Sequence, residues 1–289
     1  MAAVPRLIVL ASPGRSRLPL PDLAREAVAG SADAVLVRAP DLAPKALRAL
    51  AAPLLPVVAG RAALLVGREV GVARALGCGV HLPERGDSAA AARAALGPVA
   101  LVGRSVHSAT AAVAAASDGA DYLLAGHCFP TASHPGQPPV GLDGLAEMVA
   151  AARSPVLAIG GIDAGNAAAA IRAGAVGVAV LGAIAEAADP ARAAAAIRAA
   201  VDAALREVSG VTDDRPTSTD DATTPVMVNG KPLDLPAGTT VSAFLTGKRL
   251  TDGMAIVELN GTILGRDAYP ATTLRPGDQL EVVHAVGGG

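Results

Sequence analysis

The sequence predicts an α/β protein, with a (β/α)8 TIM barrel followed by a flexible linker and a small β-grasp domain. Three observations lead to this prediction. Short apolar runs alternate with alanine-rich segments as far as residue 205, the composition turns polar after Glu207, and strand-like patterns return from residue 226 to the end of the 289-residue chain.

The barrel is predicted from eight short apolar runs, which are typical of strands buried on both faces. They occupy residues 7–11, 34–38, 63–66, 79–82, 100–104, 122–125, 156–159 and 177–181. Each run is followed by a segment rich in helix-forming residues, such as 166–173 and 190–205. Eight such units within about two hundred residues favour a closed barrel over an open sheet.

The segment after the barrel is predicted to be a linker. Residues 209–224 (SGVTDDRPTSTDDATT) contain one Val, one Ala and no aromatic residue. Such a segment buries too little apolar surface to compensate for the entropy lost on ordering. The predicted domains are therefore a barrel at residues 1–206, a flexible linker at 207–225 and a second domain at 226–289.

The second domain begins with a predicted hairpin. A strand-like run at residues 226–228 leads into Asn229-Gly230, a pair that favours a tight hairpin turn. A short helix is expected at 241–245, and further strands at 256–259 and 279–283. A hairpin, a helix and more strands in so short a segment predict a ubiquitin-like β-grasp fold.

Composition and charge exclude several classes of function. The formal net charge is −2 without a basic block, which argues against a nucleic-acid partner. No apolar run approaches the ~18 residues of a membrane span, and the N-terminus lacks a signal-peptide pattern, so we expect a cytoplasmic protein without a membrane partner. Cys78 and Cys128 have no CxxC neighbour and are expected to be buried thiols, with no metal site. The oligomeric state, monomer or homo-oligomer, is left open.

The C-terminal domain resembles a known family in four segments. They are VNGK at 228–231, AIVELNG at 255–261, RPGD at 275–278 and the terminal glycine run. Together they resemble ThiS, the sulfur carrier protein of thiamine biosynthesis. Glycines leave a tail thin enough to enter another protein's active site.

The ThiS resemblance implies partners and a modified terminus. An E1-like adenylyltransferase (ThiF-like) would use ATP to adenylate the terminal carboxylate. Sulfur transfer would then give a thiocarboxylate, which a thiazole synthase (ThiG-like) consumes. Gly288 and Gly289 are the residues implicated. The family often ends in two glycines and this chain carries three, which leaves open whether Gly289 is the modified residue.

The barrel resembles the thiamine phosphate synthase/TenI superfamily. The shared segments are GVHL at 79–82, GADY at 119–122, FPT at 129–131, PVG at 139–141, AIGGI at 158–162 and GVAV at 177–180. Four polar positions typical of the synthase branch are altered. The synthase branch has a Lys two residues after the strand-2 Arg, whereas Arg38 is followed here by Ala39 and Pro40. After strand 3, Gly67 replaces a magnesium-binding Asp. After strand 4, Pro83-Glu84-Arg85-Gly86 replace Gly-Gln-Glu-Asp, and in the loop after FPT His134 replaces a Lys. These changes argue against the synthase reaction.

The TenI branch fits the sequence better. It carries Ser-Val-His-Ser after strand 5, matched by residues 105–108, and Gly-His-x-Phe after strand 6, matched by residues 126–129. In TenI that histidine belongs to a thiazole tautomerase, which aromatises the product of thiazole synthase. The resemblance therefore implies that His127 is the catalytic residue and that the substrate is a phosphorylated thiazole.

The residues themselves are compatible with this chemistry. Moving a proton from the ring carbon that bears the carboxylate to an exocyclic carbon needs a group that titrates near neutral pH, which suits histidine. No metal or redox cofactor is required. His127 directly follows a strand, at the barrel end where active sites lie; the alternative is a structural loop histidine.

Further residues are candidates for substrate binding. Gly160, Gly161 and Gly182 could bring backbone N–H groups to a phosphate, or could simply form turns. Arg38 could pair with the substrate carboxylate, or form a salt bridge inside the barrel. Ser105 and His107 could line the site, or could simply finish the loop after the strand. His81 is interpreted as a packed histidine, with orientation of a neighbour as the alternative, and His134 lies in a Pro/Gly loop that could act as a lid.

Three functional hypotheses follow from these observations. The first is a thiazole tautomerase fused to a sulfur carrier. The second is a thiamine phosphate synthase barrel fused to the carrier, which would couple pyrimidine and thiazole units with magnesium. The third is a catalytically inactive barrel that serves as a scaffold for the carrier domain.

Overall fold

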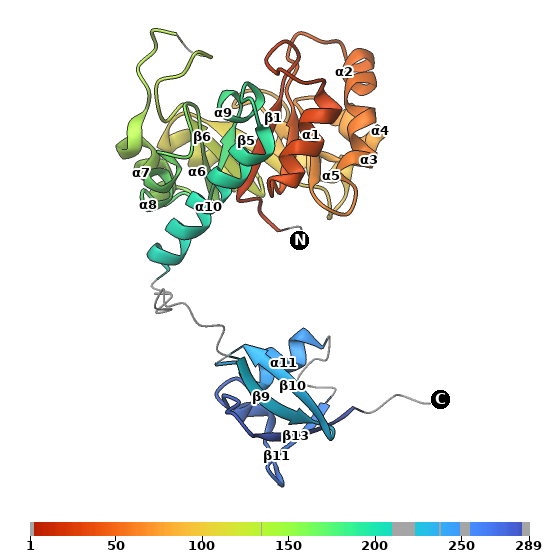
Figure 1. The fold of residues 1–289 in the computed structure, drawn as a ribbon. Helices are drawn as coiled ribbons and strands as arrows, with labels where there is room; N and C mark the ends of the chain where they lie inside the picture. Colours follow the sequence, from red (N-terminus) through yellow and green to blue (C-terminus); the bar gives the residue numbers. More distant parts are fainter. Residues whose placement is uncertain (1–2, 134, 210–222, 237, 249–254, 285–289) are drawn as a thin grey trace. The chain divides into compact units, whose positions relative to one another are not determined.

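The computed structural model describes residues 3–133, 135–209, 223–236, 238–248 and 255–284. The chain divides into two compact units, Met1–Asp213 and Asp214–Gly289. Figure 1 shows helices surrounding the strands of the first unit, and a small sheet with a helix packed on it in the second.

The first unit is a closed barrel of eight parallel strands, as the sequence predicts. Each strand pairs with its neighbours in the chain, and β1 closes the barrel by pairing with β8. The strands are β1 (Leu7–Ala11), β2 (Ala34–Val37), β3 (Ala63–Gly67), β4 (Gly79–Leu82), β5 (Val102–Val106), β6 (Tyr122–Gly126), β7 (Val156–Ile159) and β8 (Gly177–Val180).

Helices follow the strands and cover the outside of the barrel (Figure 1). Several begin at a side-chain cap: Ser88, Ser108 and Asp189 each accept a hydrogen bond from an amide in the first turn. The helices are α1 (Leu20–Ala29), α2 (Pro44–Ala51), the 3-10 helix η1 (Ala52–Leu54), α3 (Leu55–Val58), α4 (Val70–Leu76), α5 (Ala89–Leu96), α6 (Ala109–Ser117), α7 (Gly141–Ala151), α8 (Ala167–Arg172), α9 (Gly182–Ala185) and α10 (Pro190–Val208).

Alternation along the strands separates two apolar cores. One set of side chains, including Ile8, Leu36 and Leu124, fills the barrel interior, and the other packs against the helices. Tyr122 is the largest side chain inside the barrel, and it fits because its neighbour on β5 is glycine. A Cβ at Gly103 would overlap the Tyr122 ring.

The second unit has the β-grasp topology that the sequence predicts. Its five-stranded sheet has the order β10-β9-β13-β11-β12, in which β13 runs parallel to β9 and the other pairs are antiparallel. Asn229 and Gly230 form the predicted hairpin turn, with φ of 48° and 72°. The elements are β9 (Thr223–Val228), β10 (Lys231–Pro236), α11 (Val241–Gly247), β11 (Ala255–Leu259), β12 (Thr262–Ile263), the 3-10 helix η2 (Arg266–Ala268) and β13 (Gln279–His284).

Some boundaries differ from the sequence prediction. β5 starts at Val102 and continues to Val106, because Ser105 and Val106 still pair with Leu124 and Ala125 of β6. The polar Ser105 interrupts the apolar run that marks the strand in the sequence. α10 continues to Val208, and β9 already begins at Thr223. Most of the predicted linker, residues 210–222, lies outside the described residues, so the division at 206 and 226 stays a prediction.

Candidate active site at the barrel mouth

His127 directly follows β6, at the carboxyl end of the barrel, where TIM-barrel active sites lie. Its side chain is half-buried. The Nε2 atom lies 3.3 Å from the backbone carbonyl oxygen of Gln137. The carbonyl of His127 accepts a hydrogen bond from the amide of Val140, at 3.0 Å. The segment before α7 therefore folds back over the histidine.

The glycine pair after β7 packs directly against the His127 loop. The amides of Cys128 and Phe129 donate to the carbonyls of Ile159 and Gly160, at 2.8 and 3.0 Å. A Cβ on Gly160 would overlap the Cβ of His127, and one on Gly161 would lie 2.5 Å from a backbone oxygen. Both glycines also have positive φ, 93° and 67°. Close packing of the two loops thus explains both glycines, and phosphate binding by Gly160 stays a prediction.

The mouth amides without a partner among the residues that the structure describes include two that the sequence analysis proposed as phosphate donors. These are the backbone N–H groups of Gly161, after β7, and of Gly182, which opens the short helix α9 after β8. The carbonyl of Gly161 is occupied, since Asn166 Nδ2 donates to it at 2.7 Å. Unpaired amides at this end of a barrel are suitable donors for a phosphate.

Arg38 lies just beyond β2, two residues after the inward-facing Leu36, and is exposed. Its backbone amide donates to Ala11 at 2.9 Å. Among the described residues, no carboxylate lies within ion-pair distance of its guanidinium, so the alternative of a salt bridge inside the barrel is not realised there. Pairing with a substrate carboxylate stays a prediction.

His81 and Ser105 meet inside the barrel, from the neighbouring strands β4 and β5. His81 Nε2 lies 2.9 Å from Ser105 Oγ, and the imidazole stacks on the Tyr122 ring with centroids 5.7 Å apart. Burial, and secondarily the positive charge of Arg38, lower the pKa of His81 to about 3. The ring is therefore neutral at physiological pH.

The structure adds one residue that the sequence analysis did not select. A single carboxylate oxygen of Glu84 accepts hydrogen bonds from both the backbone amide and Nδ1 of His107, each at 2.8 Å. Glu84 follows β4 and His107 follows β5, so adjacent parallel strands bring them together. The adjacency of these strand ends is the signal that could have suggested the pair.

Three buried polar atoms in the barrel lack a partner among the described residues. They are Ser12 Oγ, His81 Nδ1 and the Tyr122 hydroxyl. Buried polar atoms are usually hydrogen-bonded, so an unpartnered one calls for an explanation. Ser12 follows β1, while His81 and Tyr122 lie within β4 and β6.

The cysteines are buried free thiols, as predicted. Burial raises the pKa of each to about 11, so neither is activated as a nucleophile.

His134, Gly288 and Gly289 lie outside the described residues. Within the described ranges, no group of three or more His, Cys, Asp or Glu side chains could hold a metal ion. The same ranges contain no helix with the length and apolar character of a membrane span.

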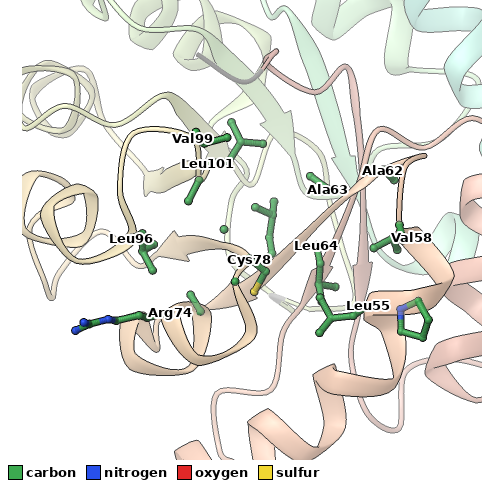
Figure 2. A pocket seen from close by; sticks show the side chains of 17 residues that line it. Leu55, Val58, Ala62, Ala63, Leu64, Arg74, Cys78, Leu96, Val99 and Leu101 are labelled. Carbon is green, nitrogen blue, oxygen red and sulfur yellow. The ribbon is translucent and has the colours of Figure 1, made fainter.

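An apolar cavity of about 700 Å³ lies at the opposite end of the barrel, where β3 to β5 begin (Figure 2). Its lining includes Leu55, Leu64, Cys78 and Leu101. It offers one charged side chain, Arg74, and the inert Cys78 thiol. We therefore assign no reaction to it.

Comparisons with known proteins identify both units. A sequence profile of the TMP-TENI family, described as thiamine monophosphate synthase, matches residues 7–184. The chain belongs to this family. A ThiS family profile matches residues 226–289. One chain thus joins a thiamine phosphate synthase/TenI barrel to a ThiS domain, as the two sequence resemblances implied.

Several named proteins are similar to the barrel. A thiamine-phosphate synthase of Roseiflexus castenholzii is 43% identical over 188 residues, covering 64% of this chain and 81% of the relative. Another thiamine-phosphate synthase, from Anaeromyxobacter dehalogenans, is 41% identical over 182 residues, covering 62% of this chain and 82% of the relative. The structure of a thiamine phosphate pyrophosphorylase from Pyrococcus furiosus is 31% identical, covers 69% of this chain and 96% of its own, and aligns with a TM-score of 0.62.

Proposed function

We propose that the chain serves the thiazole branch of thiamine biosynthesis in the cytoplasm, with the barrel as a thiazole tautomerase and the ThiS domain as a sulfur carrier. The observation that carries the tautomerase proposal is the position of His127. It is half-buried at the carboxyl end of β6, and the Gly160 backbone packs against it. A proton-transfer residue needs such a fixed position.

The reaction requires one proton to be moved. His127 would take the proton from the ring carbon that bears the carboxylate, and the electron pair released would form the ring double bond. The same imidazolium would then return the proton to the exocyclic carbon. The substrate and product are isomers, so no other reactant is needed, and the imidazole is regenerated.

The other residues at the mouth would bind the substrate. The amides of Gly161 and Gly182, which have no partner among the described residues, would donate to the phosphate, with Gly160 holding the loop in place. Arg38 would pair with the carboxylate. Ser105, which is held by His81 of β4, and His107, which is held by Glu84 just after β4, would line the site.

Thiamine phosphate synthase is the second candidate, and the relatives' names favour it more directly than tautomerase. The barrel is 43% identical to a protein so named. Residues at the mouth argue the other way. Pro40, Gly67 and Glu84 stand where the synthase branch has a Lys, a magnesium-binding Asp and a Gln, and Glu84 is engaged with His107.

A product assay on the purified full chain separates the candidates. One sample receives the non-aromatic thiazole carboxylate phosphate alone. The other receives the pyrimidine pyrophosphate, the thiazole phosphate and Mg²⁺. We expect aromatic thiazole in the first and no thiamine phosphate in the second. Thiamine phosphate in the second would establish the synthase, and no product in either would favour a scaffold barrel.

For the ThiS domain we propose a C-terminal thiocarboxylate, made at the glycine tail by a ThiF-like adenylyltransferase that uses ATP. A carboxylate oxygen is a poor leaving group, so adenylation must precede the attack by sulfur. A ThiG-like thiazole synthase would accept the sulfur. Its product would then be the substrate of the barrel on the same chain.

A further inference from the structure

His81 is a deeply buried histidine near the barrel mouth, and the proton transfer proposed above does not use it. Its side chain is 8% exposed, and Tyr122, against which it stacks, is fully buried. One ring nitrogen, Nε2, lies 2.9 Å from Ser105 Oγ. The other, Nδ1, has no partner among the described residues.

A neutral imidazole carries one proton, and its position decides what Ser105 can do. If Nδ1 carries the proton, a buried N–H donor is left without an acceptor, and Nε2 accepts the hydroxyl proton of Ser105. If Nε2 carries it, the ring donates to Ser105 and only an acceptor is left unpaired. An orphaned buried N–H is the rarer and costlier arrangement. The surroundings of His81 therefore favour the proton on Nε2.

This tautomer also fixes the direction of the Ser105 hydroxyl. A hydroxyl that accepts from His81 keeps its own proton for another acceptor. No described residue accepts a hydrogen bond from Ser105 Oγ, and the serine is half-buried at the mouth end of β5. In the free protein that acceptor is solvent, which a bound substrate would replace.

We propose that His81 is a positioning residue, whose Nε2–H donates to Ser105 and so directs the serine hydroxyl proton to an anionic oxygen of the substrate. The proposal deepens the proposed function and rests on it for the identity of the substrate. The positive charge of Arg38 acts on His81 from beyond the end of β2. The anionic oxygen belongs to a phosphate or to a carboxylate.

The tautomer can be measured without any enzyme activity. Nitrogen NMR of the full chain with ¹⁵N-labelled histidine distinguishes a protonated Nε2 from a protonated Nδ1. His81→Gln identifies the His81 signals by their loss. We expect the Nε2–H form. An Nδ1–H form would overturn the proposal, whatever the outcome of the product assay.

Anion binding tests the role of the pair. Calorimetry on the full chain would use inorganic phosphate in one series and a thiazole carboxylate without phosphate in the other. We expect Ser105→Ala and His81→Phe each to lower the binding affinity for one of these two ligands about tenfold. This is the effect of losing one hydrogen bond to a charged group. The ligand affected shows whether the oxygen belongs to phosphate or carboxylate.

Coupling between the two residues distinguishes positioning from a general structural effect. The double variant should bind no more weakly than Ser105→Ala alone, and His81→Gln, which keeps an N–H donor, should bind nearly as the wild type. Additive losses, or a Ser105→Ala variant that binds both ligands normally, would overturn the proposal. If these results hold while no thiazole is aromatised, His81 keeps its role and the proposed function fails.

Discussion

Two histidines of the barrel show how burial separates the roles of one residue type. His81 is almost completely buried against Tyr122, and its pKa falls to about 3, so it stays neutral throughout the physiological range. A neutral ring suits hydrogen bonding in a fixed tautomer. His127 is half-buried beyond the end of β6 and can meet a substrate at the mouth. The position of His127, and not the residue type alone, makes it the candidate for proton transfer.

The low pKa of His81 predicts a dependence of stability on pH. In the unfolded chain the imidazole titrates near its ordinary pKa of about 6.5, and in the folded chain near 3. The unfolded state therefore binds more protons between these values, and the free energy of unfolding falls as pH is lowered from 6.5 towards 3. The loss attributable to His81 is on the order of a few kcal/mol.

Urea unfolding of the full chain, followed by circular dichroism, checks this at several pH values. His81→Phe keeps an aromatic ring beside Tyr122 but cannot titrate. Its unfolding free energy should fall less steeply than that of the wild type between pH 6.5 and 4. Parallel curves for the two proteins would show that His81 is not held neutral by the fold.

At the scale of elements, the sequence predicts the strands better than it predicts the site. Continuous apolar runs identify all eight barrel strands, because parallel strands are buried on both faces. β5 is displaced by two residues in the prediction because its inward-facing Ser105 is polar. The Glu84–His107 pair depends on which strands are adjacent, and the sequence pattern around each residue does not contain that information. Glycine is required at positions 160 and 161 because the loop after β7 packs against the loop after β6, a contact that the sequence does not reveal.

The contact between the β6 and β7 loops gives a prediction for Gly160→Ala. The new methyl group would overlap the Cβ of His127, and φ is 93°. We expect His127 to be displaced, with tautomerase activity lost and stability lowered by about 1–3 kcal/mol. Gly60→Ala is the matched control, since Gly60 also has positive φ, 70°, but nothing within 4 Å of the added Cβ.

Activity and thermal unfolding of both glycine variants provide the measurement. The control should lose some stability and keep its activity at temperatures where it is folded. If Gly160→Ala stays as active as Gly60→Ala, the packing of the two loops does not position the catalytic group.

At the scale of the whole molecule, the chain combines two units with separate cores. The barrel encloses its own apolar interior, and the ThiS domain packs Phe244, Leu245 and Tyr269 beneath its sheet. Each unit contains the residues that its proposed task needs. Under the proposed function, this fusion would keep a sulfur donor and the enzyme for the downstream product at a high effective concentration near a shared partner.

The carrier proposal predicts a chemical change at the terminus. Incubation with ATP, a ThiF-like partner and a sulfur source should replace one oxygen of the terminal carboxylate by sulfur, which intact-protein mass spectrometry detects. Deletion of Gly288 and Gly289 should abolish the change, because the shortened tail would not reach the partner's active site. The same truncated chain should retain the barrel reaction. Sulfur transfer from a chain blocked by a C-terminal tag would contradict the carrier role.

The central claim is that the barrel aromatises a thiazole by proton transfer through His127. The most direct test is a proton NMR time course of the non-aromatic thiazole carboxylate phosphate with wild type and His127→Asn, which fills a similar space without a titrating ring. We predict conversion by the wild type and a loss of at least about 100-fold in rate for the variant, the scale of general acid–base catalysis. Equal rates for the two proteins would contradict the claim.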